Sequence, residues 1–248
     1  MGNKPLVTVV TVTYNCSLDI ENTLKSVLSQ NYPNLEYIIV DGASEDETLT
    51  IIRKYEDKIT KIVSEPDKGL YDAMNKGINI ARGHWINFMN AGDTYSDCNT
   101  ISTIFQNIYT DTGYKVLYGI TKFIHKDYSE SFHKTATGNT LTSIVHKYQP
   151  YTHQAVFYNI VDKNDCYYNI KYRIAADYDV ACRYFKKYGS AAFHYMDVVV
   201  CAYKAYDGVS TKLENKKKAL KEKILVKLNN HMSILETMKD IRRMLLLK

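Results

Sequence analysis

The most constraining feature of this sequence is a fourfold alternation of short apolar runs and helical patterns within residues 5–95. The first run, Val7–Thr13, contains only Val and Thr, and so dense a β-branched segment is typical of a strand buried on both faces of a parallel sheet. Further strands are expected at 37–40, 59–63 and 85–89, with helices after Ser17, after Ser44 and over 70–81. These repeats predict an α/β fold with a mostly parallel, Rossmann-like central sheet and helices on both faces.

The positive charge of the chain is concentrated at its C-terminal end. The 248 residues contain 32 Lys/Arg and 27 Asp/Glu, and residues 212–248 contain 11 and 4 of these. Apolar residues recur in that segment at helical spacing, namely Leu220, Ile224, Leu228, Met232, Leu235, Met238, Ile241 and Leu245. We therefore expect a basic amphipathic helical tail, which either lies on an anionic membrane surface or packs on the domain or on a twin subunit in a homodimer.

Several classes of protein are excluded by what the sequence lacks. No apolar run approaches the roughly 20 residues of a membrane-spanning helix, and the N-terminus leads into the first strand without a signal-peptide pattern. The five cysteines have no CxxC spacing, which disfavours a zinc site or a disulfide framework. We expect a cytoplasmic protein, either free or peripheral on the inner face of the cell membrane, with no nucleic-acid partner.

Polar residues follow each of the expected strands, at residues 13–15, 41–42, 65–69 and 90–93. In such sheets, ligands bind outside the carboxyl ends of the strands. A glycine-rich turn after the first strand and a Walker A loop are both missing, so backbone amides alone do not hold phosphates here. The carboxylates of Asp41, Asp67 and Asp93 fit a nucleotide sugar whose diphosphate is bridged by Mg²⁺ or Mn²⁺. Taken singly, each is also an ordinary turn residue.

These segments resemble the inverting glycosyltransferases of family 2, which have the GT-A fold, and in particular the bacterial exopolysaccharide, capsule and O-antigen branch. The resemblance is carried by VTVVTVTYN at 7–15, IVDGAS at 39–44, EPDKGLYDAMNKG at 65–77 and FMNAGD at 88–93. It is firm over residues 5–95, looser to residue 210 and absent beyond. It implies one GT-A domain with a nucleotide-sugar-binding half at 1–95 and an acceptor-binding half at 96–211, followed by the tail at 212–248.

The resemblance also assigns the donor-binding residues. It places Thr11, Tyr14 and Asp41 around the nucleobase, which is expected to be uracil. Asp67 and Gly69 are expected beside the ribose and the diphosphate. The donor is therefore expected to be a UDP-sugar.

The metal motif of the family is altered in this chain. The fourth strand ends in Asn90-Ala91-Gly92-Asp93, where the family has an Asp-x-Asp type of motif. Gly92 stands at the position that most often binds the metal. Either Asp93 takes over as the metal ligand, with Asn90 beside the donor, or metal binding is weak or assisted from elsewhere.

The acceptor side requires a carboxylate that deprotonates the attacking hydroxyl. Asp177 matches the family's catalytic base, with Asp179 beside it, and the alternative is a helix N-cap without chemistry. Residues two apart do not share a helix face, so only one should point inward. His153 and Gln154 match an acceptor-side polar pair, although His153 also fits a structural role. Residues 204 and 207–210 resemble a segment that closes over the diphosphate.

The resemblance implies transfer of a hexosyl or N-acetylhexosaminyl group from the UDP-sugar to an acceptor hydroxyl, with inversion. The acceptor is expected to be a saccharide on a polyprenyl-type lipid. Two alternatives stay open. A sugar nucleotidyltransferase would need a Gly-rich, Arg-containing loop after the first strand, where this chain has Tyr14–Ser17. A catalytically impaired partner or membrane-binding subunit would account for the altered metal motif and the basic tail.

Overall fold

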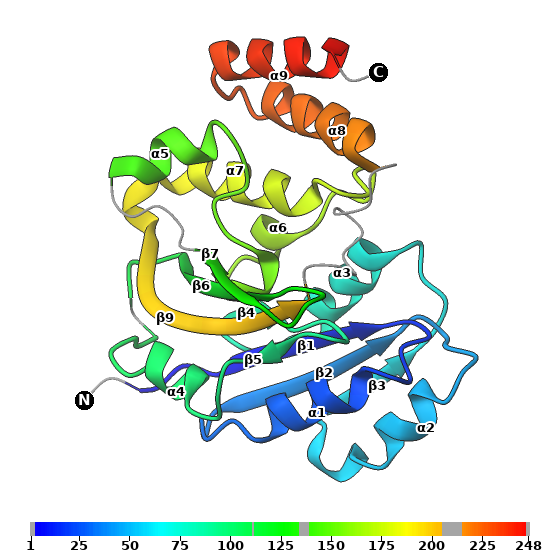
Figure 1. Ribbon diagram of the computed structural model, residues 1–248. Coiled ribbons are helices and arrows are strands. Elements are labelled where there is room, and N and C mark those ends of the chain that lie inside the picture. The colour runs from blue at the N-terminus through cyan, green and yellow to red at the C-terminus, as the bar shows by residue number, and fades with distance from the viewer. Residues whose placement is uncertain (1–2, 111, 134–138, 205–214, 247–248) are drawn as a thin grey trace.

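The computed structural model describes residues 3–110, 112–133, 139–204 and 215–246 (Figure 1). Within these residues a nine-stranded sheet has the order β3-β2-β1-β4-β8-β6-β9-β5, with β7 paired to β6. The strands are β1 Val7–Thr13, β2 Leu35–Asp41, β3 Lys61–Ser64, β4 Trp85–Phe88, β5 Thr94–Tyr95, β6 Val116–Ile124, β7 Glu130–His133, β8 Val156–Asn159 and β9 Phe193–Lys204.

The helices alternate with the strands in the first half of the chain and dominate its last part. They are α1 Ile20–Leu28, α2 Thr48–Arg53, α3 Leu70–Ile80, α4 Thr100–Ile104, α5 Asn139–Val145, α6 Lys163–Cys166, α7 Ala176–Tyr188, α8 Lys216–Asn229 and α9 Ile234–Leu246. Short 3₁₀ turns lie at Glu56–Lys58, His153–Ala155 and Ser190–Ala192.

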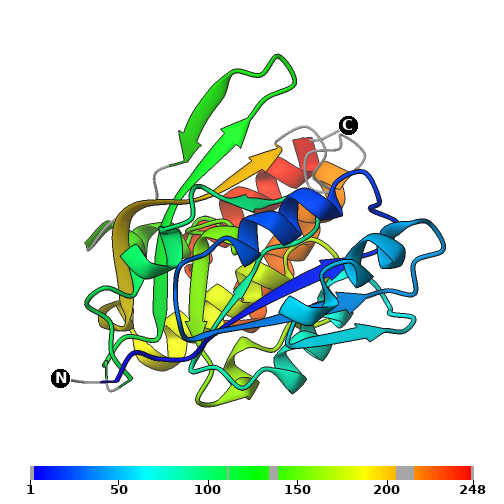
Figure 2. The same cartoon turned by 90° about the horizontal axis from the view of Figure 1, so that it is seen from below.

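The N-terminal half of the sheet is parallel, as the sequence predicts. β1 pairs in parallel with both β2 and β4, and β2 pairs in parallel with β3. Beyond β4 the sheet is mixed, because β8 is antiparallel to β4 and β6, whereas β6 and β9 are parallel. β6 is a single long strand, which continues into the projecting β6–β7 hairpin (Figure 2).

Both faces of the sheet are covered by helices, which explains the unbroken β-branched composition of β1. Val9 belongs to the apolar cluster that contains α1, α2 and α4 side chains. Its neighbour Val10 points the other way, into the cluster with α3, α5 and α7. Every residue of β1 is buried.

Two expected helix starts are corrected by the structure. Asp19, not Ser17, is the N-cap residue of α1, and it makes no side-chain capping bond. Ser44 does not cap α2, because its hydroxyl donates to the Asp41 carboxylate instead. The Ser17 amide donates to the Asp46 carboxylate at 3.1 Å, so both serines take part in the polar edge of the sheet.

The C-terminal segment forms two helices rather than one continuous helix (Figure 1). The nearly fully buried Lys227 of α8 pairs with Asp240 of α9 at 2.7 Å. The apolar residues that recur at helical spacing in this segment are divided between interior and surface. Leu220, Ile224 and Met232 are buried, whereas the exposed ones are Leu228, Leu235, Met238, Ile241 and Leu245.

Candidate active site

The carboxyl ends of the parallel strands meet at one edge of the sheet, as the sequence predicts. Thr13 at the end of β1 is in register with Asp41 at the end of β2, and Asp41 is in register with Ser64 of β3. Asn90 and Asp93 follow β4, the other neighbour of β1. The segments chosen from the sequence therefore lie side by side.

Asp41 is fully buried and holds the turn that follows β2. Its Oδ2 accepts hydrogen bonds from the Ser44 amide at 3.0 Å and the Ser64 hydroxyl at 2.7 Å, and its Oδ1 accepts from the Ser44 hydroxyl at 2.5 Å. An ionised carboxylate has about four acceptor positions, so one remains after these three bonds. Contact with a nucleotide requires this turn to rearrange.

Thr11 is completely buried, and its hydroxyl lies 2.8 Å from the Met89 carbonyl oxygen and 2.9 Å from the Tyr37 hydroxyl. Its side chain is on the same face of β1 as those of Val9 and Thr13. Its expected place beside the nucleobase stays a prediction. Thr13, at the end of β1, has a buried hydroxyl without a hydrogen-bond partner among the described residues. Tyr14 is 58% exposed and available to a ligand.

Asp67 and Gly69 form a tight turn directly before α3. The Asp67 Oδ1 accepts a hydrogen bond from the Gly69 amide at 2.7 Å, and Gly69 has a φ of 117°, which favours glycine. Asp67 also lies against Gly42, since a Cβ atom at residue 42 would be 2.5 Å from the Asp67 Oδ2. The turns after β2 and β3 therefore contact each other at a position where a side chain has no room.

Asn90 and Asp93 are held by the two residues expected to bind the acceptor. The Gln154 amide donates to the Asp93 Oδ2 at 3.0 Å, and Asn90 Nδ2 lies 2.9 Å from His153 Nε2. Burial raises the pKa of Asp93 to about 7 and lowers that of His153 to about 4, so the His153 ring is neutral. Gln154 is buried, so its side chain supports the turn after β4 rather than facing an open acceptor site.

The oxygen atoms of this turn fit a divalent cation. The part of the chain that the structure describes has no group of three or more His, Cys, Asp or Glu placed to hold a metal. Asn90 Oδ1, however, is buried without a hydrogen-bond partner among those residues, and Asp93 supplies a carboxylate. Mg²⁺ is commonly held by one or two protein oxygens together with water and substrate phosphates. Asp93 and Asn90 therefore suffice if the donor diphosphate completes the ligand set.

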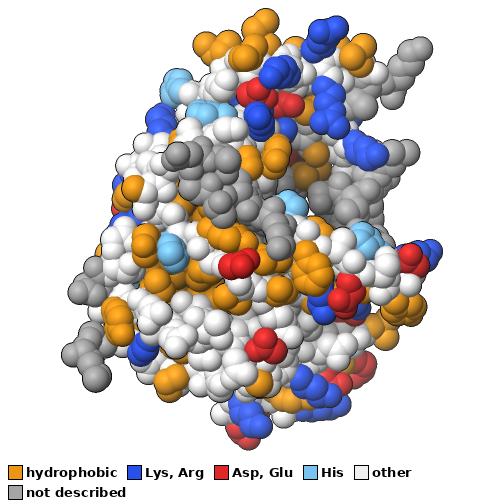
Figure 3. Space-filling view, turned by 60° about the vertical axis from the view of Figure 1, so that its left-hand side comes forward, with side chains coloured by type: hydrophobic (Ala, Val, Ile, Leu, Met, Phe, Trp, Pro, Cys, Tyr) orange, Lys and Arg blue, Asp and Glu red, His pale blue; other side chains and the backbone are white. Residues whose placement is uncertain are grey.

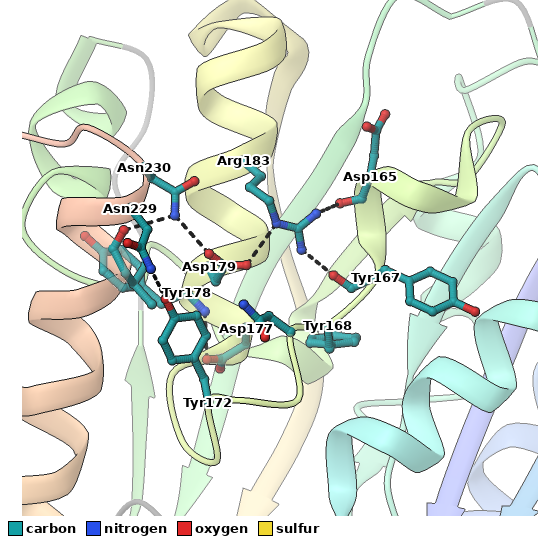
Figure 4. Close-up of polar contacts among 12 residues, drawn as sticks. Asp165, Tyr167, Tyr168, Tyr172, Asp177, Tyr178, Asp179, Arg183, Asn229 and Asn230 are labelled. Atoms are coloured by element: carbon teal, nitrogen blue, oxygen red, sulfur yellow. Dashed lines mark hydrogen bonds and ion pairs between the residues drawn. The ribbon is translucent and has the colours of Figure 1, made fainter.

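Asp177 and Asp179 point in different directions, as their spacing predicts (Figure 4). Asp179 is committed to structure, because its carboxylate pairs with Arg183 at 2.9 Å and accepts from Asn230 at 2.9 Å. Asp177 makes none of the ion pairs found among the described residues, and its Oδ1 accepts from the Tyr178 amide at 2.8 Å. Ala175 is the N-cap of α7, so Asp177 lies in the first turn. It is not the capping residue.

Burial raises the pKa of Asp177 to about 6. Buried tyrosines surround it from other elements, and its negative charge contributes to the raised pKa values of Tyr71, Tyr158 and Tyr168. These phenols stay protonated near neutral pH, so Asp177 is the group that titrates there. A carboxylate with a pKa near the working pH is well suited to accept a proton.

Two residues of the 65–77 motif connect the donor side to Asp177, a role that the sequence did not reveal. The Tyr71 hydroxyl donates to the Ile174 carbonyl at 3.0 Å, and the Asn75 side chain bonds both the amide and the carbonyl of Tyr168, at 2.8 and 2.9 Å. Tyr71 also stacks on the Tyr168 ring, with centroids 5.2 Å apart. Their membership in the longest motif was the available signal.

Of the segment expected to close over the diphosphate, Lys204 is described, and it pairs with Asp19 beside α1. The remainder, at 207–210, lies outside the described residues. A cavity of about 390 Å³ lies elsewhere, between α7, the 164–172 segment and the end of α8, and includes Tyr168, Asp179 and Asn230 in its lining. Asp179, in its lining, lies two residues after Asp177.

Comparison with known proteins identifies the family. The model of Glycosyl transferase family 2 matches residues 8–176, more than half of the chain. A Mycobacterium tuberculosis protein named PGL/p-HBAD biosynthesis glycosyltransferase is 28% identical over 222 residues, covering 86% of this chain and 82% of that protein. The chain therefore belongs to glycosyltransferase family 2, whose members transfer glycosyl groups.

Solved structures of glycosyltransferases confirm the fold. S. aureus TarS 1–349 in complex with UDP-GlcNAc has a TM-score of 0.67 at 17% identity, covering 96% of this chain and 71% of that one. The mannosyltransferase PcManGT from Pyrobaculum calidifontis, in complex with GDP-Man and Mn²⁺, has a TM-score of 0.65 at 16% identity, covering 90% and 65%. The described part of this chain is a GT-A-like α/β fold with C-terminal helices.

Proposed function

We propose that this chain transfers a sugar from a UDP-sugar to an acceptor hydroxyl with inversion, and that Asp177 is the general base. The observation that carries the proposal is the state of Asp177: a half-buried carboxyl free of ion pairs among the described residues, with its pKa raised to about 6. Its neighbour Asp179 is by contrast fully occupied by Arg183 and Asn230. The bound UDP and UDP-GlcNAc of the TarS structures support a uridine donor.

In this reaction the acceptor oxygen attacks the anomeric carbon from the side opposite to the nucleotide. The new carbon–oxygen bond forms while the bond to the diphosphate breaks, and the electron pair leaves with UDP. Asp177 takes the proton of the attacking hydroxyl, which contributes about 10²–10⁴ in rate. A bound Mg²⁺ or Mn²⁺ ion would neutralise charge on the diphosphate, and Asp93 and Asn90 are the residues that would hold it.

The relatives suggest the setting of the reaction. The similarity to glycosyltransferases of bacterial PGL/p-HBAD and teichuronic acid biosynthesis supports a role in bacterial glycan assembly. We propose that a hexosyl or N-acetylhexosaminyl group is transferred there to a lipid-linked acceptor. No helix among the described residues is long and apolar enough to cross a membrane. A membrane-binding surface among these residues is a further part of the proposal.

We place that surface on α9. Its exposed residues include Ile234, Leu235, Met238 and Leu245, beside the exposed cations Lys239, Arg242 and Arg243. Figure 3 shows hydrophobic, Lys and Arg side chains gathered at the end of the molecule where α8 and α9 lie. An apolar face flanked by Lys and Arg suits the anionic inner surface of a bacterial membrane, since each cation contributes about 1 kcal/mol there. The alternative is that this face of α9 packs against a second copy of the chain.

A donor screen tests the proposal. We expect UDP-sugars to raise the melting temperature more than GDP- or dTDP-sugars, with a further rise on adding Mn²⁺, because ligands that bind the folded state stabilise it. The UDP-sugar with the largest shift is then tested for Mn²⁺-dependent UDP release. Binding without turnover above background would identify a catalytically impaired subunit instead.

A further inference from the structure

α8 is packed into the protein and is not a free basic tail. Val226 belongs to the apolar cluster that includes Val180 and Ala181 of α7. Leu220 and Ile224 are buried as well. Between them lies Glu222, an acidic residue within a strongly basic helix, which is also buried, at 7% exposure.

Glu222 accepts three backbone hydrogen bonds from the segment that leads into α7. Its Oε1 accepts from the Arg173 amide at 3.1 Å, and its Oε2 accepts from the amides of Ile174 at 2.8 Å and Ala175 at 3.1 Å. Hydrogen bonds to a carboxylate are about twice as strong as bonds between neutral groups. The three amides lie directly before α7, which begins at Ala176, so Glu222 fixes the backbone that leads into this helix.

The same segment is held from two other directions. On the donor side, the Tyr71 hydroxyl bonds the Ile174 carbonyl, so residue 174 is bonded at both its amide and its carbonyl. On the α8 side, the Asn229 amide donates to the Tyr172 hydroxyl at 2.7 Å (Figure 4). Asp177 follows two residues after the last amide that Glu222 binds.

We propose that Glu222 is a positioning residue that fixes the backbone before α7 and thereby aims Asp177 at the reacting hydroxyl. The inference rests on the proposed role of Asp177 as base. It makes the C-terminal helices part of the active centre, although the resemblance to the family ends before them. A misplacement of about 1 Å in a catalytic group is enough to cost roughly 10²-fold in rate.

The test compares Glu222→Gln and Glu222→Ala with a control, Lys227→Met. Gln retains one carbonyl acceptor but turns an NH₂ group toward an amide, so its effect should be smaller than that of Ala. The control removes the buried cation that joins α8 to α9 and leaves Asp240 with its second partner, Lys223. It disturbs the helical pair without touching residues 173–175.

For the Glu222 variants we expect kcat for UDP release at saturating donor to fall by about 10- to 100-fold, with the Kd for UDP unchanged. Lys227→Met should lower the melting temperature and leave kcat, measured well below that temperature, as in the wild type. Wild-type kcat in Glu222→Gln and in a folded Glu222→Ala would overturn the proposal, because Glu222 would then serve only to attach α8. Equal loss of kcat in the control would overturn it too.

Amide hydrogen exchange supplies a readout that does not depend on turnover. We expect faster exchange at residues 173–178 in Glu222→Gln than in Lys227→Met. Equal exchange at these amides in both variants would contradict the inference whatever the activity. If the two variants differ in exchange as expected but the wild-type chain releases no UDP, the proposed function is wrong. The role of Glu222 in fixing residues 173–175 would then still be supported.

Discussion

The hydroxyl of Tyr71 donates a hydrogen bond to the carbonyl oxygen of Ile174, 3.0 Å away and 103 residues later in the chain. Tyr71 lies in the first turn of α3, directly after the turn that carries Asp67 and Gly69, and Ile174 lies three residues before Asp177. The bond therefore joins the proposed donor-side loop to the segment that leads to Asp177, the proposed base. Such a link keeps the two halves of the site in a fixed relation.

Gly42 is required for the contact between the turns after β2 and β3. A Cβ atom at this position would lie 2.5 Å from the Asp67 Oδ2 and 3.3 Å from the Tyr14 ring. We expect Gly42→Ala to displace both side chains and to weaken UDP binding about tenfold, which corresponds to roughly 1.4 kcal/mol. Calorimetric titration with UDP measures this. Gly113→Ala, where a Cβ meets nothing within 4 Å, should bind as the wild type does.

The pH dependence of turnover should follow Asp177. Burial raises its pKa to about 6, and the base must be ionised to accept a proton. The neighbouring phenols of Tyr71, Tyr158 and Tyr168 have raised pKa values and stay neutral. We expect kcat at saturating donor and Mn²⁺, where the bound cation would keep Asp93 ionised despite its pKa of about 7, to fall tenfold per pH unit below about pH 6. A kcat that stays constant down to pH 4.5 would exclude Asp177 as the base.

The same raised pKa predicts that Asp177 destabilises the folded protein at neutral pH. Because the folded state binds this proton more tightly than the unfolded state, the favourable contribution is complete below the unfolded value of 3.8 and is lost as the pH rises through about 6. Asp177→Asn should therefore stabilise the protein by about 1–3 kcal/mol at pH 7.5 and by less at pH 5. Thermal unfolding at the two pH values checks this. A gain in stability that is equal at both would mean that the carboxyl is solvated.

The parallel half of the fold could be predicted because its information is local. The Val/Thr run of β1 predicts a strand buried on both faces, and the helical spacing of Leu24 and Val27 predicts the helix that follows it. The pairing of β5 with β9 joins residues about 100 apart, such as Tyr95 and Cys201, and leaves no pattern in either segment. Ser44 does not cap a helix because the Asp41 carboxylate accepts from its amide and its hydroxyl, a contact between separate turns that no local pattern indicates.

Residue type and strand position together predicted that Asp41 and Asp93 lie at one edge of the sheet, and their roles there stay predictions. Thr11 and Thr13 both carry a hydroxyl and lie at alternate positions of β1, so residue type alone does not distinguish the buried Thr11 from the strand end. No sequence pattern indicated a role for Glu222 in the candidate site. A single acid among lysines on a helix is typical of a solvated face, and only the packing of α8 shows that it is buried.

The exposed face of α9 should bind anionic vesicles. We expect the full chain to co-sediment with vesicles containing phosphatidylglycerol at low salt and to be released by salt, because the Lys and Arg contribution is screened. Leu235→Glu places a charge in this face and should abolish sedimentation. Val161→Glu, at an equally exposed apolar position remote from α9, should not. If wild-type protein does not sediment and is a dimer in solution, the face is a subunit interface.

The most direct test of the central claim is the configuration of the first sugar released when water replaces the acceptor. With an α-linked UDP-sugar, proton NMR recorded before mutarotation should show the β-anomer first, because water attacks opposite to the diphosphate with Asp177 as base. Asp177→Asn should slow this release by about 10² or more while binding UDP normally. First appearance of the α-anomer, or wild-type release by Asp177→Asn, would contradict inversion through Asp177.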